Sequence, residues 1–111
     1  MTSNKILIVI SNLEFGGAQR QVVELVNNMD KEKCDIHVCS LSDYVPLANQ
    51  FKPGTQLHII NKKAKFDFSV VFKLTALIKQ HQFNVIHSYL FDAEIAARLA
   101  GKLSNTGIKI I

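Results

Sequence analysis

Apolar residues are arranged in two ways along this chain: in short continuous segments, and at intervals of three or four positions. The short continuous segments predict strands. Five consecutive aliphatic residues, Ile6 to Ile10, are typical of a strand that is buried on both faces. Further apolar segments predict strands at 36–41, at 56–60, within 83–92, where a short strand runs into a loop, and at 108–111. The chain is therefore expected to contain five strands.

Between these segments, apolar residues recur every three or four positions, which predicts three helices. Because helices alternate with strands, we expect an α/β fold: a Rossmann-like, three-layer parallel sheet with right-handed crossovers and the strand order 3-2-1-4-5. The predicted apolar faces are Ala18, Val22, Leu25, Val26 and Met29; then Val70, Val71, Leu74, Leu77 and Ile78; then Ala96, Leu99, Ala100 and Leu103.

The predicted strand order places the first and fourth strands side by side, where a ligand crevice is expected outside their carboxyl ends. Gly16 and Gly17 follow the first strand, and a turn at 87–89 follows the fourth. This position favours a functional role for His87 over a structural one. The two glycines have two interpretations. They either bring the backbone and the N-terminus of the next helix close to a phosphate or sugar, or they only allow a tight turn.

Length and composition narrow the classes of protein. At 111 residues the chain is one domain at most. No apolar segment approaches the ~18 residues that a membrane-spanning helix needs. The N-terminus lacks the pattern of a signal peptide, so we expect a cytoplasmic protein. The net charge of +4 is compatible with phosphates or an anionic membrane surface, and too few aromatics are interleaved with basic residues for a nucleic-acid platform.

The other candidate residues receive structural interpretations. Cys34 and Cys39 have no metal-binding spacing and are expected to be reduced. We expect His37 and His58 to be packed or hydrogen-bonded within strands, and His81 to interact with the dipole at a helix C-terminus.

A basic segment, 61–68, holds three lysines beside two phenylalanines. It is either a solvated loop or a contact with anionic lipid head groups, formed by Lys62, Lys63 and Lys65.

With these features together, the chain resembles the N-terminal part of a family-4 glycosyltransferase of the two-domain GT-B type. The resemblance covers essentially all 111 residues. It lies in the buried first strand, the Phe-Gly-Gly-Ala-Gln-Arg turn at 15–20, the stretch 83–89 and the Ala-rich helix at 93–103.

The resemblance implies transfer of a hexose from a UDP- or GDP-sugar to a hydroxyl acceptor, a glycan or a lipid-linked sugar, as in polysaccharide biosynthesis. Such transfer usually retains the anomeric configuration and uses no bound metal or other cofactor. It also implies that residues 1–111 are the acceptor-side domain. The C-terminal nucleotide-sugar domain, with its Glu-x7-Glu motif, is absent from this sequence, so the chain alone is expected to be inactive. The last predicted strand ends the sequence, which predicts either the front part of a longer polypeptide or a truncated chain. The expected location is cytoplasmic, with peripheral contact on the inner face of the membrane.

By position, Gly16 and Gly17 match the family's donor-diphosphate loop, and Gln19 matches a position that contacts the acceptor. His87 matches the first histidine of a frequent His-x-His pattern after the fourth strand, but Tyr89 stands where the second histidine would be. Tyr89 offers a hydroxyl there instead. No catalytic residue is assigned.

Two other classes of function remain open from the sequence. A non-catalytic Rossmann-like binding module fits the short length. An enzyme that uses a nucleotide cofactor, either a nicotinamide-dependent oxidoreductase or a sugar-nucleotide epimerase, is the other. The oxidoreductase predicts a G-x-G-x-x-G turn and an acid at the end of the second strand, whereas the turn here is Asn-Leu-Glu-Phe-Gly-Gly and Asp43 is the one candidate acid.

Overall fold

A computed structural model describes residues 4–13, 16–30, 32–61, 68–104 and 107–111. Their strands form one parallel sheet in the order β3-β2-β1-β4-β5, which confirms the predicted fold class and strand order. The elements are β1 (Asn4–Ile10), α1 (Gly17–Asn28), β2 (Cys34–Ser40), a 3-10 turn η1 (Ala48–Gln50), β3 (Gln56–Ile59), α2 (Phe68–His81), β4 (Val85–Tyr89), α3 (Phe91–Ser104) and β5 (Lys109–Ile110).

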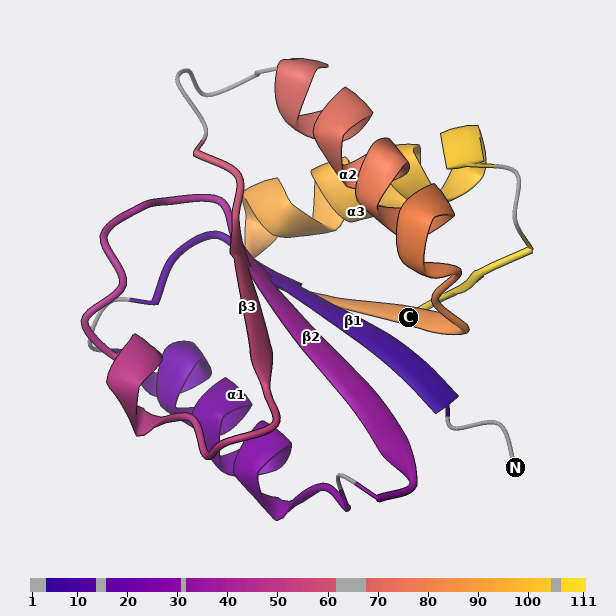
Figure 1. Ribbon diagram of the computed structural model, residues 1–111. Coiled ribbons are helices and arrows are strands. Elements are labelled where there is room, and N and C mark those ends of the chain that lie inside the picture. The colour runs from indigo at the N-terminus through magenta and orange to yellow at the C-terminus, as the bar shows by residue number, and fades with distance from the viewer. Residues whose placement is uncertain (1–3, 14–15, 31, 62–67, 105–106) are drawn as a thin grey trace.

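Strand β1 is the centre of the sheet. It pairs along its whole length with β2 on one side and, from Ile6 to Ile10, with β4 on the other. The residues from Leu7 to Ile10 are at most 1% exposed, as predicted for a strand covered on both faces. Figure 1 shows the reason: α1 covers one face of the sheet, and α2 and α3 cover the other.

The alternation of side chains along each strand divides the core into two layers. In β1, Leu7 and Val9 face α2 and α3, whereas Ile8 and Ile10 face α1. Strand β2 repeats this division, because Cys39 lies on the α2–α3 face and Val38 on the α1 face. A residue's position in a strand therefore decides which helix layer it meets.

The predicted apolar faces of two helices need correction. In α3, Ala96 and Ala100 are buried as expected, but Leu99 is 42% exposed and Leu103 is 54% exposed. The buried face is rotated toward Ala93 and Ala97, since alanines allow α3 to pack close to the sheet and α2. In α1, likewise, Leu25 is 40% exposed, and Val23 takes its place in the core.

The predicted turn at 87–89 is wrong. His87, Ser88 and Tyr89 all belong to β4 and pair with β1, so His87 lies in the middle of the strand and not at its end. The chain leaves the strand at Leu90, whose φ of 75° is unusual for a residue with a side chain.

Two observations concern membranes. The basic residues Lys62, Lys63 and Lys65 lie outside the described residues. In the part of the chain that the structure describes, no helix combines the length and apolar character needed to cross a bilayer.

Candidate functional site

Two helix N-termini meet the carboxyl ends of β1 and β4. Helix α1 begins at Gly17, shortly after β1 ends, and α3 begins at Phe91, directly after β4 ends. The sequence order of the strands reverses between β1 and β4, which is where an open parallel sheet forms its ligand crevice. In Figure 1, α3 starts beside the converging ends of the strands. The site is therefore built on the two central strands of the sheet.

Neither glycine of the pair is required by its backbone conformation. Gly16 has an extended backbone with φ of −158°, which any residue can adopt. Among the described glycines, the left-handed conformation occurs at Gly54 and Gly107. The interpretation of Gly16 and Gly17 as a tight turn that needs glycine therefore has no support in the backbone angles.

The space around the two glycines gives each a different role. A Cβ atom at Gly16 would lie 2.5 Å from Gln19 Oε1, so Gly16 leaves room for the Gln19 side chain. A Cβ at Gly17 would meet no atom of the described residues within 4 Å, its chain neighbours aside. Gly17 thus borders open space at the start of α1.

The N-terminus of α1 is suited to an anion. Its N-cap, Gly16, has no side chain with which to cap the helix, and the Gly16 carbonyl accepts the first intrahelical hydrogen bond from the Arg20 amide at 3.0 Å. The amide groups before Arg20 point out of the helix toward the start of α1. Such amides, together with the positive end of the helix dipole, favour a phosphate.

Residues directly after β1 connect this strand to both helices. The side-chain amide of Gln19 donates a hydrogen bond of 2.8 Å from Nε2 to Asn12 Oδ1, which holds the Gln19 side chain at the crevice. Ser11 Oγ accepts a hydrogen bond from the Ala93 amide at 3.3 Å, in the first turn of α3. Ser11 and Asn12 therefore fix the positions of α3 and α1 relative to each other.

His87 and Tyr89 form a pair on β4. They occupy alternate positions opposite Ile8 and Ile10 of β1, so both side chains lie on the α1 face of the sheet. Their ring centroids are 4.7 Å apart, with the planes inclined by 31°. Tyr89 packs against the core beneath α1 and is half-buried. The structure thus brings His87 to Tyr89 on β4, and Gln19 to Gly16 at the start of α1, which follows the neighbouring strand β1.

The sequence interpretation missed one group of polar residues. The sequence predicts separate structural positions for His37, His58 and His81, yet their rings come together on the α2–α3 face. The sequence did contain one signal, because His37 and His58 are in strands that lie side by side in the sheet. Side chains alternate between the two faces along each strand, so half of the possible pairing registers place both histidines on the same face. The register pairs Cys39 with His58, so His37 and His58 do share a face.

The family model of Glycosyltransferase Family 4 matches residues 15–111, and no curated protein matches the chain. Among solved structures, the chain is similar to the apo form of the lipopolysaccharide outer core galactosyltransferase WaaB, with a TM-score of 0.67 and 16% identity. The match covers 96% of this chain and 32% of that one, so the chain spans about a third of that protein's length. At this identity the likeness concerns the fold, whereas the family match covers most of the sequence: the chain belongs to Glycosyltransferase Family 4.

Proposed function

We propose that residues 1–111 form the N-terminal, acceptor-side domain of an enzyme that transfers a hexose from a UDP- or GDP-sugar to a hydroxyl acceptor. The observation that carries the proposal is the start of α1: among the described residues, no side chain caps it and no atom lies near the Cβ position of Gly17. Membership of the family supports sugar transfer over the oxidoreductase, epimerase and binding-module alternatives.

In this proposal the start of α1 contributes to the departure of the nucleotide. Negative charge develops on the diphosphate as the bond to the sugar breaks. Amide groups and a helix dipole that already point at that position stabilise the charge without having to reorganise. Gly17 allows the phosphate to approach the backbone, since no Cβ stands in the way.

The neighbouring polar side chains are assigned to the sugar and the acceptor. Gln19 is held by Asn12 through its amide nitrogen, which leaves its carbonyl oxygen on the side of Gly16. That oxygen is suited to accept a hydrogen bond from an acceptor hydroxyl. His87 and Tyr89 supply an imidazole and a phenol on β4, in place of the two histidines of the frequent family pattern.

The remainder of the site is assigned to a second domain. WaaB, which shares the fold, is about three times as long as the matched region. We propose that a C-terminal domain holds the nucleotide sugar and closes the crevice from the opposite side. The 111-residue chain alone is then inactive.

The test is sugar transfer by the complete polypeptide that contains this chain. Nucleotide release from UDP- and GDP-hexoses is measured with candidate glycan and lipid-linked acceptors, for the wild type and for Gln19→Ala. Gln80→Ala, on α2, is the matched control, because it removes the same side chain on the opposite face of the sheet. We expect Gln19→Ala to reduce transfer at least tenfold and the control to have no effect. Equal activity of all three proteins, or reduction of NAD in place of transfer, would contradict the proposal.

We further propose that the basic residues Lys62, Lys63 and Lys65 bring the domain to an anionic membrane surface on the cytoplasmic side. Two exposed aromatics in the first turns of α2, close to these lysines in the sequence, support the proposal: Phe68 is 71% exposed and Phe72 is 67% exposed. Lysines beside aromatic side chains are typical of peripheral contacts with anionic lipids. A lipid-linked acceptor would be reached from such a position.

Sedimentation with vesicles of phosphatidylserine and phosphatidylcholine tests this contact. Each lysine near the surface contributes about 1 kcal/mol, so changing all three to Glu is expected to lower vesicle binding by about a hundredfold or more. The matched control carries the same change of charge at three exposed lysines elsewhere, Lys33, Lys52 and Lys109. Equal loss in both triple variants would reduce the effect to net charge and contradict a specific contact.

A further inference from the structure

Three imidazole rings from three elements gather on the face of the sheet that α2 and α3 cover. His37 lies in the middle of β2, His58 in β3 and His81 at the end of α2. One ring nitrogen from each residue can be chosen such that all three atoms lie within 4.8 Å of one another. Rings from segments this far apart in the sequence meet only in the folded chain. Imidazole nitrogens are ligands that zinc, copper and nickel ions prefer.

His37 and His58 approach each other edge to edge. Their ring planes are nearly parallel, inclined by 4°, and the centroids are 5.0 Å apart, whereas His37 Nδ1 and His58 Nε2 are 2.7 Å apart. Since the two nitrogens are much closer than the centroids, they point toward each other. Without a metal ion, one of them donates a hydrogen bond to the other.

The other ring nitrogen of His37, Nε2, lies near a carboxylate but makes no hydrogen bond to it. His37 is fully buried, and its Nε2 lies 3.2 Å from Asp35 Oδ1 without the alignment of a hydrogen bond. A small rotation of either side chain would allow an Nε2–H group to donate to this carboxylate. A carboxylate in that position typically orients a histidine whose other nitrogen binds a metal.

We propose that His37, His58 and His81 bind one divalent transition-metal ion, with zinc as the test ion, and that Asp35 orients His37. In a tetrahedral zinc site, two imidazole nitrogens about 2.0–2.1 Å from the ion are about 3.3 Å apart. The 2.7 Å contact must therefore open, and the longer separations, which reach at most 4.8 Å, must close. His58 and His81 are half-buried, which leaves their rings room to rotate.

Of the charged groups near the cluster, one favours a bound cation and another opposes it. Burial is the main cause that lowers the pKa values of His37 and His58 from their ordinary value. The Asp35 carboxylate favours a cation nearby. The Lys5 ammonium, which donates a hydrogen bond of 3.0 Å to the His81 carbonyl, opposes one. Removing the Lys5 charge is therefore expected to strengthen binding.

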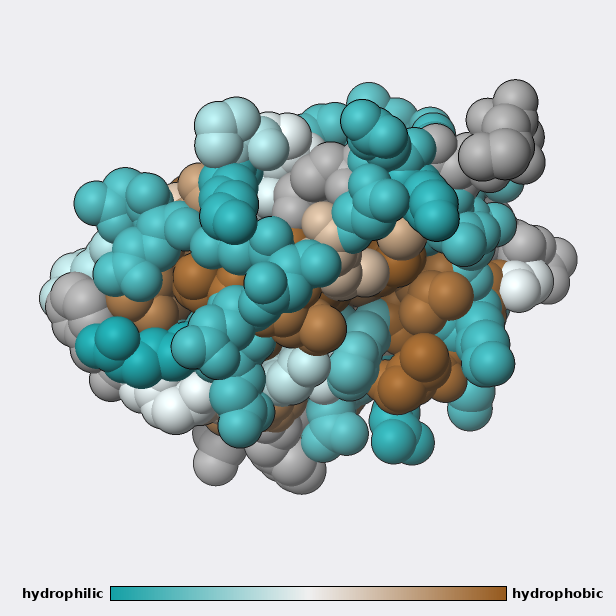
Figure 2. Space-filling model, turned by 90° about the horizontal axis from the view of Figure 1, so that it is seen from below, coloured by the Kyte–Doolittle hydropathy of each residue, from teal (hydrophilic) through white to brown (hydrophobic). Residues whose placement is uncertain are grey.

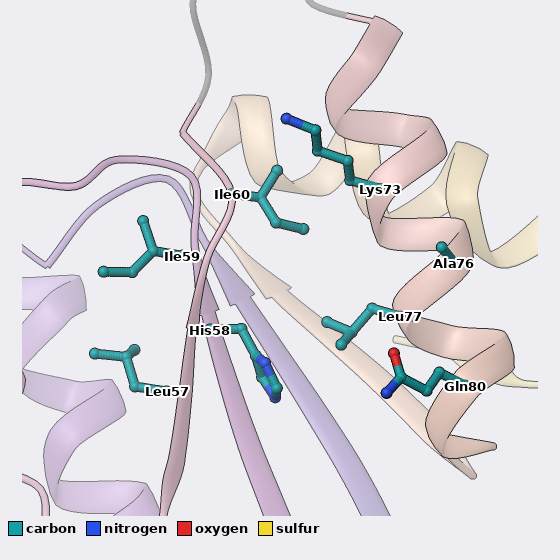
Figure 3. Close-up of a pocket in the computed structure, with 8 residues that line it drawn as sticks. All are labelled: Leu57, His58, Ile59, Ile60, Lys73, Ala76, Leu77 and Gln80. Atoms are coloured by element: carbon teal, nitrogen blue, oxygen red, sulfur yellow. The ribbon is translucent and has the colours of Figure 1, made fainter.

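A path from solvent to the cluster exists. An open hollow of about 510 Å³ lies between β3 and α2, and His58 is one of its lining residues. In Figure 3 the His58 ring points from β3 into the space between the sheet and α2, with Leu77 and Gln80 on the helix side. An ion can reach His58 through this hollow without unfolding of the chain.

The test is a zinc titration of the untagged 111-residue chain against a competing chromophoric chelator, followed by thermal unfolding with and without zinc. We expect one ion to bind per chain and the midpoint of unfolding to rise. His58→Gln and His81→Gln should each weaken binding at least tenfold and abolish the thermal shift. Both positions are half-buried, so these variants are expected to fold. His87→Gln, a half-buried histidine on the opposite face of the sheet, is the matched control and should bind zinc like the wild type.

Two further variants test the surroundings. Asp35→Asn should weaken zinc binding about tenfold or more, as expected for loss of an orienting carboxylate, and Lys5→Gln should strengthen it. Cobalt(II) in place of zinc should give the visible absorption of a tetrahedral site. The proposal is overturned if the wild type binds zinc no more tightly than His58→Gln, if His81→Gln leaves the affinity unchanged, or if cobalt shows only the weak absorption of an octahedral ion.

Discussion

Replacing Gly17 by Ala is expected to stabilise the fold and to reduce sugar transfer. In the part of the chain that the structure describes, a Cβ atom at this position would meet no atom within 4 Å apart from its chain neighbours, and Gly17 does not have a positive φ. The substitution therefore introduces no clash and no backbone strain. Alanine at such a site limits the unfolded chain more than glycine does, which is worth about 0.4–1 kcal/mol. In the same position the methyl group would occupy the space proposed for the donor diphosphate.

The stability change is measured by urea unfolding of the 111-residue chain, followed by circular dichroism. With an m value of about 1 kcal/mol/M, the midpoint should rise by about 0.4–1 M. Gly16→Ala is the matched control. Its new methyl group would displace Gln19 Oε1, and loss of the bond from Gln19 to Asn12 offsets the gain with a cost of about 1 kcal/mol.

The functional change is measured in the complete polypeptide as nucleotide release. Hydrogen bonds to a charged group contribute about 1.5–3 kcal/mol, so loss of one amide contact to the departing diphosphate should lower the rate by about 10- to 150-fold. Unchanged transfer in a stabilised Gly17→Ala enzyme would refute the assignment of this space to the donor. Lower stability of Gly17→Ala would show that the space at the start of α1 is wrongly described.

Three further predictions follow from other contacts. Gly101→Ala removes a glycine from α3, yet it should lower the free energy of unfolding by about 1 kcal/mol, because the new Cβ would lie 2.6 Å from Ile110 Cδ1. The additional substitution Ile110→Val removes that carbon, so urea unfolding should show that it restores part of the lost stability. Cys39 is fully buried, and burial raises the pKa of its thiol to about 12. In a Cys34→Ser chain, this thiol should therefore react with a disulfide reagent only after unfolding. Prompt reaction of the folded chain would contradict this prediction. Ser11→Ala, which leaves the amide at the start of α3 without its acceptor, should lower the free energy of unfolding by about 0.5–1 kcal/mol, and an unchanged urea midpoint would show that the 3.3 Å contact contributes nothing.

The sheet could be predicted from the sequence because its determinants are local. The continuous apolar segment Ile6–Ile10 requires cover on both faces, and alternation of strands with helices restricts the topology to few orders. The exact helix faces could not be predicted in the same way. Leu99 and Leu103 fit the helical period as well as the alanines do, but close packing of α3 against α2 and the sheet selects the smaller side chains.

The end of β4 was predicted incorrectly for a similar reason. No glycine or proline marks the end of this strand, and the chain turns at Leu90 with a positive φ, which residues with side chains seldom adopt. His87 therefore belongs to the strand, and its pairing with Ile8 sets the face on which it lies. The candidate site gained its most specific features, the Gln19–Asn12 bond and the open space at Gly17, from contacts that no sequence pattern encodes.

The two proposed sites lie on parts of the sheet whose positions depend on different contacts. The crevice is built on β1 and β4, whose positions are fixed by pairing at the centre of the sheet. Strand β3 is at an edge, has four residues and is only partly buried, so its position depends on contacts with the layer above it. On the α2–α3 face, His58 meets His37 of β2 and His81 of α2. A metal ion bound there would connect the edge strand to its neighbour and to the covering helix. Because the crevice uses none of these three side chains, such an ion would stabilise the domain without changing the groups proposed to bind the sugar nucleotide.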